Sequence, residues 1–278
     1  MDSIKADVPF DVLAEIDTRP VSTLQNASFT ARQLWENDVQ EPASWLSSFL
    51  RPKSLTLVHA APGTGKTPFT MQLCNAALGY KNLFNWRGER EDKARSCYYM
   101  DGELPLWLLK RNATANFHPD AQVTFFHAAS WYSAGNMGLD LGRVEIQDAL
   151  RMELERIKPD ILVLDNRSNF YHGEENSNDD AHILNRFLIE IREQGAAILI
   201  NHHQGKMGQS RGASAIHDVM DTVIRMDKIE QSENIAQEHF RFNIHFEKAR
   251  MGWLPPRGIV AKIQPTGEIM MFDNEVYI

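Results

Sequence analysis

One short loop restricts what this chain can fold into more than any other feature. Residues 60–67, Ala-Ala-Pro-Gly-Thr-Gly-Lys-Thr, follow an apolar run of strand length and precede a helical pattern. Gly63 and Gly65 permit backbone conformations that are closed to other residues, so successive amides can point at one anion. The following helix adds the partial positive charge of its N-terminus. A strand, a glycine-rich loop and a helix in this order predict a loop that binds the phosphates of a nucleotide.

The residues of this loop have distinct expected roles. Lys66 is expected to reach the outer phosphates, and the Thr67 hydroxyl to ligate the Mg²⁺ that bridges them. Ala60 replaces the usual first glycine, which removes some freedom at the strand end and leaves the loop itself intact. Pro68 stands early enough in the helix for its missing amide to cost little. With ATP and Mg²⁺ as the expected ligands, the predicted contacts are Pro62, Gly63, Thr64, Gly65, Lys66, Thr67 and Pro68.

Apolar runs alternate with helical patterns through the middle of the chain. Each run is apolar on both faces, which is typical of a sheet that helices cover on both sides. The alternation predicts parallel strands joined by crossover helices. After Met226 apolar and polar residues alternate instead, which predicts antiparallel strands and hairpins. The predicted parallel strands are 55–58, 97–100, 123–126, 161–164 and 197–200; helices follow Lys66 and span 104–116, 143–157 and 179–193; the antiparallel strands are 240–247, 259–263 and a run after Gly267.

The composition favours one α/β domain with an appendage. The chain has 278 residues, of which 43 % are hydrophobic and 24 % charged, and it contains no low-complexity tract. Its first fifty residues are polar and interrupted by prolines, and two short helices are expected there, at 31–38 and 42–49. We therefore expect an N-terminal arm over residues 1–50 and a nucleotide-binding domain over residues 51–278.

Charge, cysteine content and hydropathy argue against several classes of protein. The formal net charge of -8 argues against a broadly basic surface, so a contact with nucleic acid needs a local cluster of cations. Cys74 and Cys97 form no CxxC pair, which favours a reducing compartment over a disulfide framework. The chain start lacks the layout of a secretory signal, and no apolar stretch approaches the length of a membrane helix. We expect a cytoplasmic protein with no membrane partner.

Polar residues that end the apolar runs are the next candidates, because ligands of open α/β sheets bind at the carboxyl ends of the strands. Asp165 ends the run 161–164 and is the expected carboxylate that holds Mg²⁺, directly or through water. Glu103 follows the run 97–100 and is the preferred general base for an attacking water molecule. Asp101 is the alternative base.

The fifth apolar run ends in Asn201-His202-His203. An amide or imidazole here, with His202 as the candidate, can sense the γ-phosphate and transmit its presence to the next segment. That segment, 204–214, is polar, glycine-rich and locally basic through Lys206. The loop that begins at Arg167 is also long and polar. Two such loops are either plain surface loops or the lining of a channel for single-stranded DNA, with Lys206 and Arg167 as contacts.

These motifs resemble, in their order, those of the RecA-like ATPases. The closest resemblance is to the small hexameric plasmid replicative helicases of the RepA type, which are relatives of the DnaB ring helicases. It covers roughly residues 55–252, most of the chain. The segments that carry it are 60–67, 98–105, 162–165, 201–203, 210–212 and 247–250.

The resemblance implies a RecA-like three-layer α/β/α core with a mostly parallel sheet, followed by antiparallel strands. It also implies a ring of subunits with ATP at each interface and hydrolysis by Glu103. Cations from the neighbouring subunit are expected to assist, and the choice among Arg211, Lys248 and Arg250 is open. By analogy, the N-terminal arm is expected to pack on that neighbour.

The expected function is an ATP-dependent helicase or translocase that forms a homo-oligomeric ring, with a hexamer as the expected number, on single-stranded DNA. Its expected setting is replication of a plasmid, phage or related mobile element. Two alternatives remain open. One is an ATP-gated regulator or loader without unwinding activity, and the other is a RecA-like recombination or repair ATPase.

Overall fold

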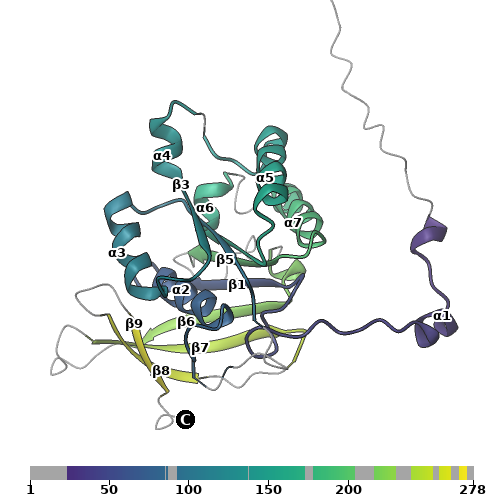
Figure 1. Cartoon of the computed structure of the whole chain (residues 1–278), viewed down its shortest axis with the longest axis horizontal. Helices are drawn as coiled ribbons and strands as arrows, with labels where there is room; N and C mark the ends of the chain where they lie inside the picture. The colour runs from purple at the N-terminus through teal and green to yellow at the C-terminus, as the bar shows by residue number, and fades with distance from the viewer. Residues whose placement is uncertain are drawn as a thin grey trace, which may run out of the picture. The chain divides into compact units, whose positions relative to one another are not determined.

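The structure is a computed structural model that divides into two units, Met1–Glu41 and Pro42–Ile278. It describes residues 24–84, 86, 93–136, 138–172, 178–203, 216–229, 239–252, 257–263 and 269–273. Each unit is described by itself. All strands of the described residues belong to the larger unit (Figure 1).

Helices and strands alternate along the larger unit in the predicted order. Every strand and helix expected between residues 55 and 203 is present, with bounds close to the predicted ones. The elements are β1 (Leu55–Ala60), α2 (Lys66–Ala77), β2 (Cys97–Asp101), α3 (Leu106–Asn116), β3 (Val123–His127), α4 (Ala128–Ser133), α5 (Val144–Ile157), β4 (Ile161–Asp165), α6 (Arg167–Phe170), α7 (Asn178–Arg192), β5 (Ala197–His203), β6 (Thr222–Ile229), β7 (His239–Ala249), β8 (Arg257–Ile263) and β9 (Ile269–Asp273). Across the described ranges, no helix combines the length and apolar character needed to cross a bilayer.

The described strands form one sheet in the order β3-β2-β4-β5-β1-β6-β7-β8-β9. From β3 to β6, neighbouring strands pair in parallel. From β6 to β9 they pair antiparallel. This arrangement confirms the predicted mostly parallel sheet with antiparallel C-terminal strands. The sequence did not predict β6, which joins the two parts because it pairs with β1 on one side and β7 on the other.

Helices cover both faces of the parallel part of the sheet (Figure 1). Successive side chains of a strand point to opposite faces, so Val58 and Leu57 of β1 belong to different apolar clusters. Val58 shares its cluster with Phe69 of α2, whereas Leu57 shares its cluster with Leu150 of α5 and Leu188 of α7. The core therefore has the three-layer α/β/α build expected from the resemblance.

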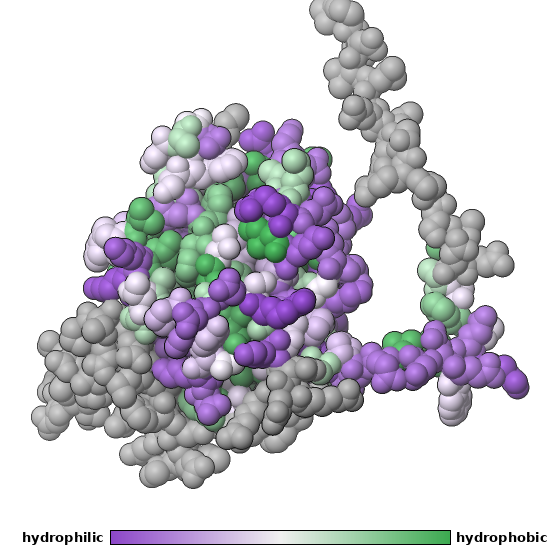
Figure 2. Space-filling view, in the orientation of Figure 1, coloured by the Kyte–Doolittle hydropathy of each residue, from purple (hydrophilic) through white to green (hydrophobic). Residues whose placement is uncertain are grey.

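An apolar cavity of about 280 Å³ lies beside the edge strand β3. Its lining includes Tyr98, Phe126, Trp131 and Leu150, which come from β2, β3, α4 and α5. In Figure 2, green patches between the positions of α3 and α5 mark apolar side chains that reach the surface. The lining includes no residue of β1 or α2, so this cavity is separate from the glycine-rich loop.

Residues 42–50 belong to the larger unit rather than to the arm, which corrects the predicted boundary at residue 50. The helix predicted for 42–49 is absent, because Leu46 and Leu50 pair in an isolated bridge and Ser47 takes a positive φ of 50°. Phe49 is buried and its ring lies 5.4 Å from Trp86. These contacts fix the segment to the core.

The smaller unit contains a short helix, α1 (Ala31–Glu36), with a complete capping box. The Thr30 hydroxyl accepts a hydrogen bond from the Gln33 amide, and the Gln33 side chain accepts one from the Thr30 amide. None of its residues is buried, and Trp35 is 90 % exposed. The predicted helix at 31–38 is therefore present in a slightly shorter form.

Replacing Phe49 with Ala tests whether residues 42–50 are part of the core. The loss of a buried aromatic ring is expected to lower the free energy of unfolding by about 3–5 kcal/mol. Trp35→Ala removes an exposed aromatic ring of the arm and is expected to change it by less than about 0.5 kcal/mol. Urea unfolding followed by far-UV circular dichroism measures the free energy of unfolding of both variants. Equal effects of the two substitutions would mean that residues 42–50 are not part of the core.

Candidate active site

The glycine-rich loop connects β1 to α2, and both of its glycines take left-handed backbone conformations. Gly63 and Gly65 have φ values of +73° and +95°, which lie in the left-handed region that favours glycine. Gly65 is the N-cap of α2 and makes no side-chain capping bond. A Cβ atom built on Gly63 would meet nothing within 4 Å, so the space beside the loop is open. The N-terminus of α2 beside this open space suits an anion.

Lys66 is the first residue of α2 and is buried. Only 6 % of the residue is exposed, and Nζ donates hydrogen bonds to the carbonyl oxygens of Ala60 and Ala61 at 3.1 and 3.2 Å. Nζ also lies 3.1 Å from Nδ1 of His203. Burial lowers the pKa of Lys66, although the nearby carboxylates of Asp165 and Glu103 act to raise it.

Asp165 ends β4 in a buried position that suits a ligand of Mg²⁺. It is 3 % exposed, and Oδ2 accepts a hydrogen bond of 2.6 Å from the Tyr99 hydroxyl. Burial and the adjacent Asp165 carboxylate raise the pKa of Tyr99 well above its usual value, so the phenol keeps its proton and donates. Thr67 stands on the first turn of α2 and is a partly exposed residue.

This donor set fits Mg²⁺ that arrives with a nucleotide. The described residues contain no group of three or more His, Cys, Asp or Glu side chains that could hold a metal ion. Nucleotide-bound Mg²⁺ needs no such group, because it takes most of its oxygen ligands from phosphates and water and only one or two from protein. Thr67 and Asp165 are the residues that would hold it.

Glu103, Asn166 and His203 form a hydrogen-bonded group beside Lys66. The Asn166 amide nitrogen Nδ2 lies 2.7 Å from Glu103 Oε2 and 2.8 Å from His203 Nε2. Glu103 Oε2 and His203 Nε2 are themselves 3.5 Å apart. The structure thus brings the predicted base Glu103 to the phosphate loop. It adds Asn166, whose only signal in the sequence is its place directly after Asp165.

His203, rather than the predicted His202, faces Lys66. Adjacent residues of a strand point to opposite faces, and His202 is buried near the imidazoles of His59 and His217. Burial lowers the pKa of His202 to about 3, so its ring is neutral. The structure therefore brings His203, the second member of the pair, and not the predicted His202 to Lys66 of the phosphate loop.

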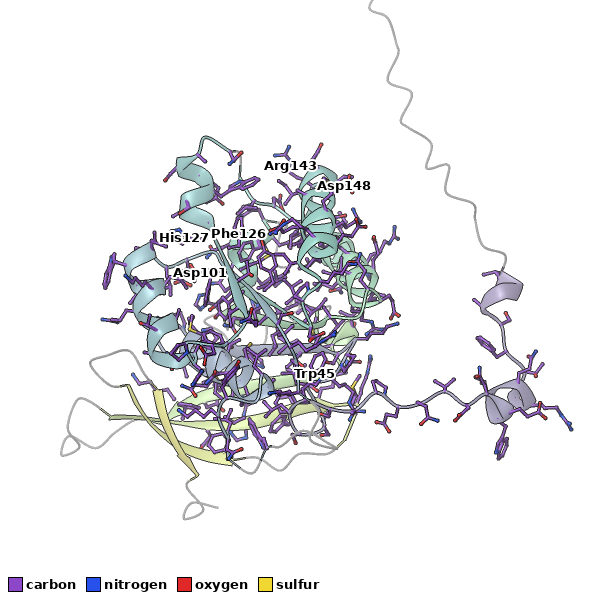
Figure 3. All side chains as sticks on the ribbon, in the orientation of Figure 1. Trp45, Asp101, Phe126, His127, Arg143 and Asp148 are labelled. Carbon is purple, nitrogen blue, oxygen red and sulfur yellow. The ribbon has the colours of Figure 1, made fainter. Side chains whose placement is uncertain are left out.

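The carboxylate of Asp101, the alternative base, is hydrogen-bonded to the backbone of the loop that carries Glu103. It is 1 % exposed, and Oδ1 accepts hydrogen bonds from the Leu104 and Glu103 amides at 2.9 and 3.3 Å. Figure 3 shows it beside His127, its register partner on β3. Because 53 % of the Glu103 side chain is exposed, Glu103 is the carboxylate that a water molecule can reach.

The remaining predicted cations are spread over several places. Lys248 and Arg250, near the end of β7, both donate to backbone oxygens of residues 217–218, and 52 % of the Arg250 side chain is exposed. Arg167 is 5 % exposed and lies over the Tyr171 ring, which argues against its use as a surface contact for DNA. Lys206 and Arg211 lie outside the described residues.

Two solved structures share this fold at low sequence identity. The KaiC-like protein PH0186 from the hyperthermophilic archaeon Pyrococcus horikoshii OT3 aligns with a TM-score of 0.56 and 15 % identity, covering 84 % of this chain and 99 % of that one. The flagellar accessory protein FlaH from Methanocaldococcus jannaschii aligns with a TM-score of 0.54 and 13 % identity, covering 80 % and 90 %. These likenesses show the fold alone. Comparison with curated proteins gave no match.

The fold, together with the loop between β1 and α2, defines a RecA-like P-loop ATPase. The chain belongs to the AAA domain family, whose model matches residues 21–209. This match includes the phosphate loop, Glu103, Asp165 and both histidines at the end of β5.

Asp101→Asn is expected to alter how stability depends on pH. Burial raises the pKa of Asp101 from 3.8 to about 6, so the folded state binds this proton more tightly than the unfolded state. The stabilisation that this proton gives to the folded state is complete below the pKa of Asp101 in the unfolded chain. It is lost as the pH rises through the pKa of Asp101 in the folded protein. Wild type should therefore lose up to about 3 kcal/mol relative to Asp101→Asn between about pH 4 and pH 7. Urea unfolding at several pH values measures the difference, and a constant difference would contradict the raised pKa.

Proposed function

We propose that this protein is a ring-forming ATP-dependent helicase or translocase that acts on single-stranded DNA in the replication of a plasmid, phage or related mobile element. The observation that carries the proposal is the position of His203. It contacts Lys66 of the phosphate loop at 3.1 Å and directly precedes the glycine-rich segment that contains Lys206. A residue in this place can pass the state of the nucleotide to a segment that holds a polymer.

The site supports hydrolysis of ATP by attack of water on the γ-phosphorus. Glu103 accepts a proton from the water while the oxygen–phosphorus bond forms and the bond to the bridging oxygen breaks, which gives ADP and inorganic phosphate. Lys66 offsets the negative charge that builds on the γ-phosphate oxygens. Thr67 and Asp165 would hold Mg²⁺, which would supply further positive charge to offset that of the phosphates.

A neighbouring subunit is proposed to complete the site. Lys248 and Arg250 lie close together near the end of β7, and the Arg250 side chain is half exposed. A cation that reaches the γ-phosphate from another copy can raise the rate of hydrolysis by about a thousandfold or more. Arg211 is the third candidate, and the N-terminal arm is the proposed contact that joins the copies.

An ATP-gated regulator or loader that does not unwind DNA is the second candidate. The net charge of -8 favours it, because a protein that holds a DNA strand usually presents a strongly basic surface. The burial of Arg167 also favours the regulator or loader, because Lys206 is then the main predicted DNA contact. A recombination or repair ATPase would instead form open filaments, which electron microscopy with ATP and DNA distinguishes from rings.

Glu103→Gln is expected to lower kcat for ATP hydrolysis by about 100-fold to 1,000-fold, because the amide cannot accept the proton of the attacking water. Asp101→Asn, by contrast, should retain most of the turnover if Glu103 is the base. Release of inorganic phosphate measures both variants. Full turnover in Glu103→Gln would remove this residue from the reaction.

Single-stranded DNA is expected to raise kcat of the wild type, and Lys206→Ala to weaken this stimulation while the affinity for ATP stays unchanged. Lys53→Ala is a matched control, because Lys53 is an exposed cation that pairs with Glu193 at 2.9 Å, away from the phosphate loop. Turnover that saturating DNA leaves unchanged would argue against the helicase. Stable ATP-dependent oligomers that never unwind a forked duplex would then favour the regulator or loader.

A further inference from the structure

Asn166 is a buried amide that connects two functional side chains. It is 2 % exposed, its Nδ2 group contacts Glu103 Oε2 and His203 Nε2, and its Oδ1 accepts a hydrogen bond of 2.9 Å from the Ser168 hydroxyl. The orientation of the amide follows from chemistry. An ionised carboxylate only accepts hydrogen bonds, so the NH₂ side of Asn166 must face Glu103.

Glu103 depends on this contact for its direction. Its side chain is 53 % exposed and has three rotatable bonds, so without a partner it would occupy several rotamers. Among the described contacts, its carboxylate meets Asn166 at 2.7 Å and His203 at 3.5 Å. A base that accepts a proton from an attacking water must be held within hydrogen-bond reach of it, and displacement by about 1 Å can cost about a hundredfold in rate.

The proton of His203 connects this group to the phosphate loop. A neutral imidazole has one N–H, yet both of its ring nitrogens here face donors, Lys66 Nζ and Asn166 Nδ2. The ring nitrogen that carries the hydrogen cannot accept a hydrogen bond from the donor that faces it. Only one of the two donors, Lys66 or Asn166, can therefore bond to the imidazole at a time. Phosphate oxygens that draw Lys66 away from His203 remove the conflict, because Nδ1 then carries the hydrogen and Nε2 accepts from Asn166. Both hydrogens of the Asn166 amide are then used, one on His203 and one on Glu103.

We infer that Asn166 is a positioning residue, which fixes the Glu103 carboxylate and couples its position to Lys66 through His203. The inference rests on the proposed function, because it takes Glu103 as the base. Asn166 itself is not assigned a contact with the nucleotide. Its effect is therefore expected in the step that uses Glu103 and not in nucleotide binding.

Asn166→Ala is expected to lower kcat by about tenfold to a hundredfold while the affinity for ATP changes less than about twofold. In the Glu103→Gln background, the same substitution should cost less than about twofold, because the group that Asn166 positions is already disabled. Single-turnover hydrolysis of labelled ATP measures the four proteins of this cycle, and binding of a fluorescent ATP analogue measures their affinities.

Two further variants keep the test decisive. Asn166→Asp preserves the shape of the side chain but removes its donors, so it should show the same loss of kcat even if Asn166→Ala fails to fold. Asn75→Ala is the matched control, because Asn75 is also buried, at 5 % exposed, and its Oδ1 accepts from the His118 amide at 3.1 Å, away from the site. It should lower stability without changing kcat.

The outcomes separate the inference from the function on which it rests. Unchanged kcat in both Asn166 variants, or an equal loss with and without Glu103, would overturn the positioning role while the ATPase proposal stands. Unchanged kcat in Glu103→Gln would instead overturn the base assignment itself. Loss of ATP affinity in parallel with kcat would place Asn166 in nucleotide binding and so contradict the inference.

Discussion

A buried lysine that pairs with no carboxylate of the described residues is the constraint on which the active site depends. Lys66 is 6 % exposed, and the described contacts of its Nζ are two carbonyl oxygens and an imidazole. Burying a cation without a paired anion costs free energy, which is why the pKa of Lys66 is lowered. Phosphate oxygens of a bound nucleotide would supply the missing negative charge. The fold therefore holds a cation directly beside the glycine-rich loop.

The order of the strands determines which side chains meet this cation. Because β5 lies between β1 and β4, the residue that ends β5 stands between the phosphate loop and Asp165. Because β2 pairs with β4, Glu103 comes within 2.7 Å of Asn166. A single edge of the sheet thus carries the loop, Asp165, His203 and Glu103, although they are far apart in the sequence.

Much of the fold could be predicted from the sequence, because buried parallel strands are apolar on both faces and end in polar residues. The strand β6 escaped prediction, since Thr222–Ile229 mixes polar and apolar residues where the sheet changes from parallel to antiparallel pairing. The place of residues 42–50 in the core was not predicted, because their burial depends on aromatic rings that are distant in the sequence, such as Trp86. At the site, the motif indicated Lys66 and Asp165. Which of the two histidines faces Lys66 depends on the alternation of side chains along β5. The contact between Asn166 and Glu103 depends on the pairing of β2 with β4.

The central claim is that the amides of the glycine-rich loop and Lys66 bind the phosphates of a nucleotide. Equilibrium binding of ATP with Mg²⁺ to the wild type, Lys66→Ala and the surface control Lys53→Ala tests it most directly. We expect saturable binding by the wild type and the control, and a loss of affinity of at least about tenfold in Lys66→Ala, because a charged hydrogen bond is removed. A wild type that binds no nucleoside triphosphate, or equal binding by Lys66→Ala, would contradict it.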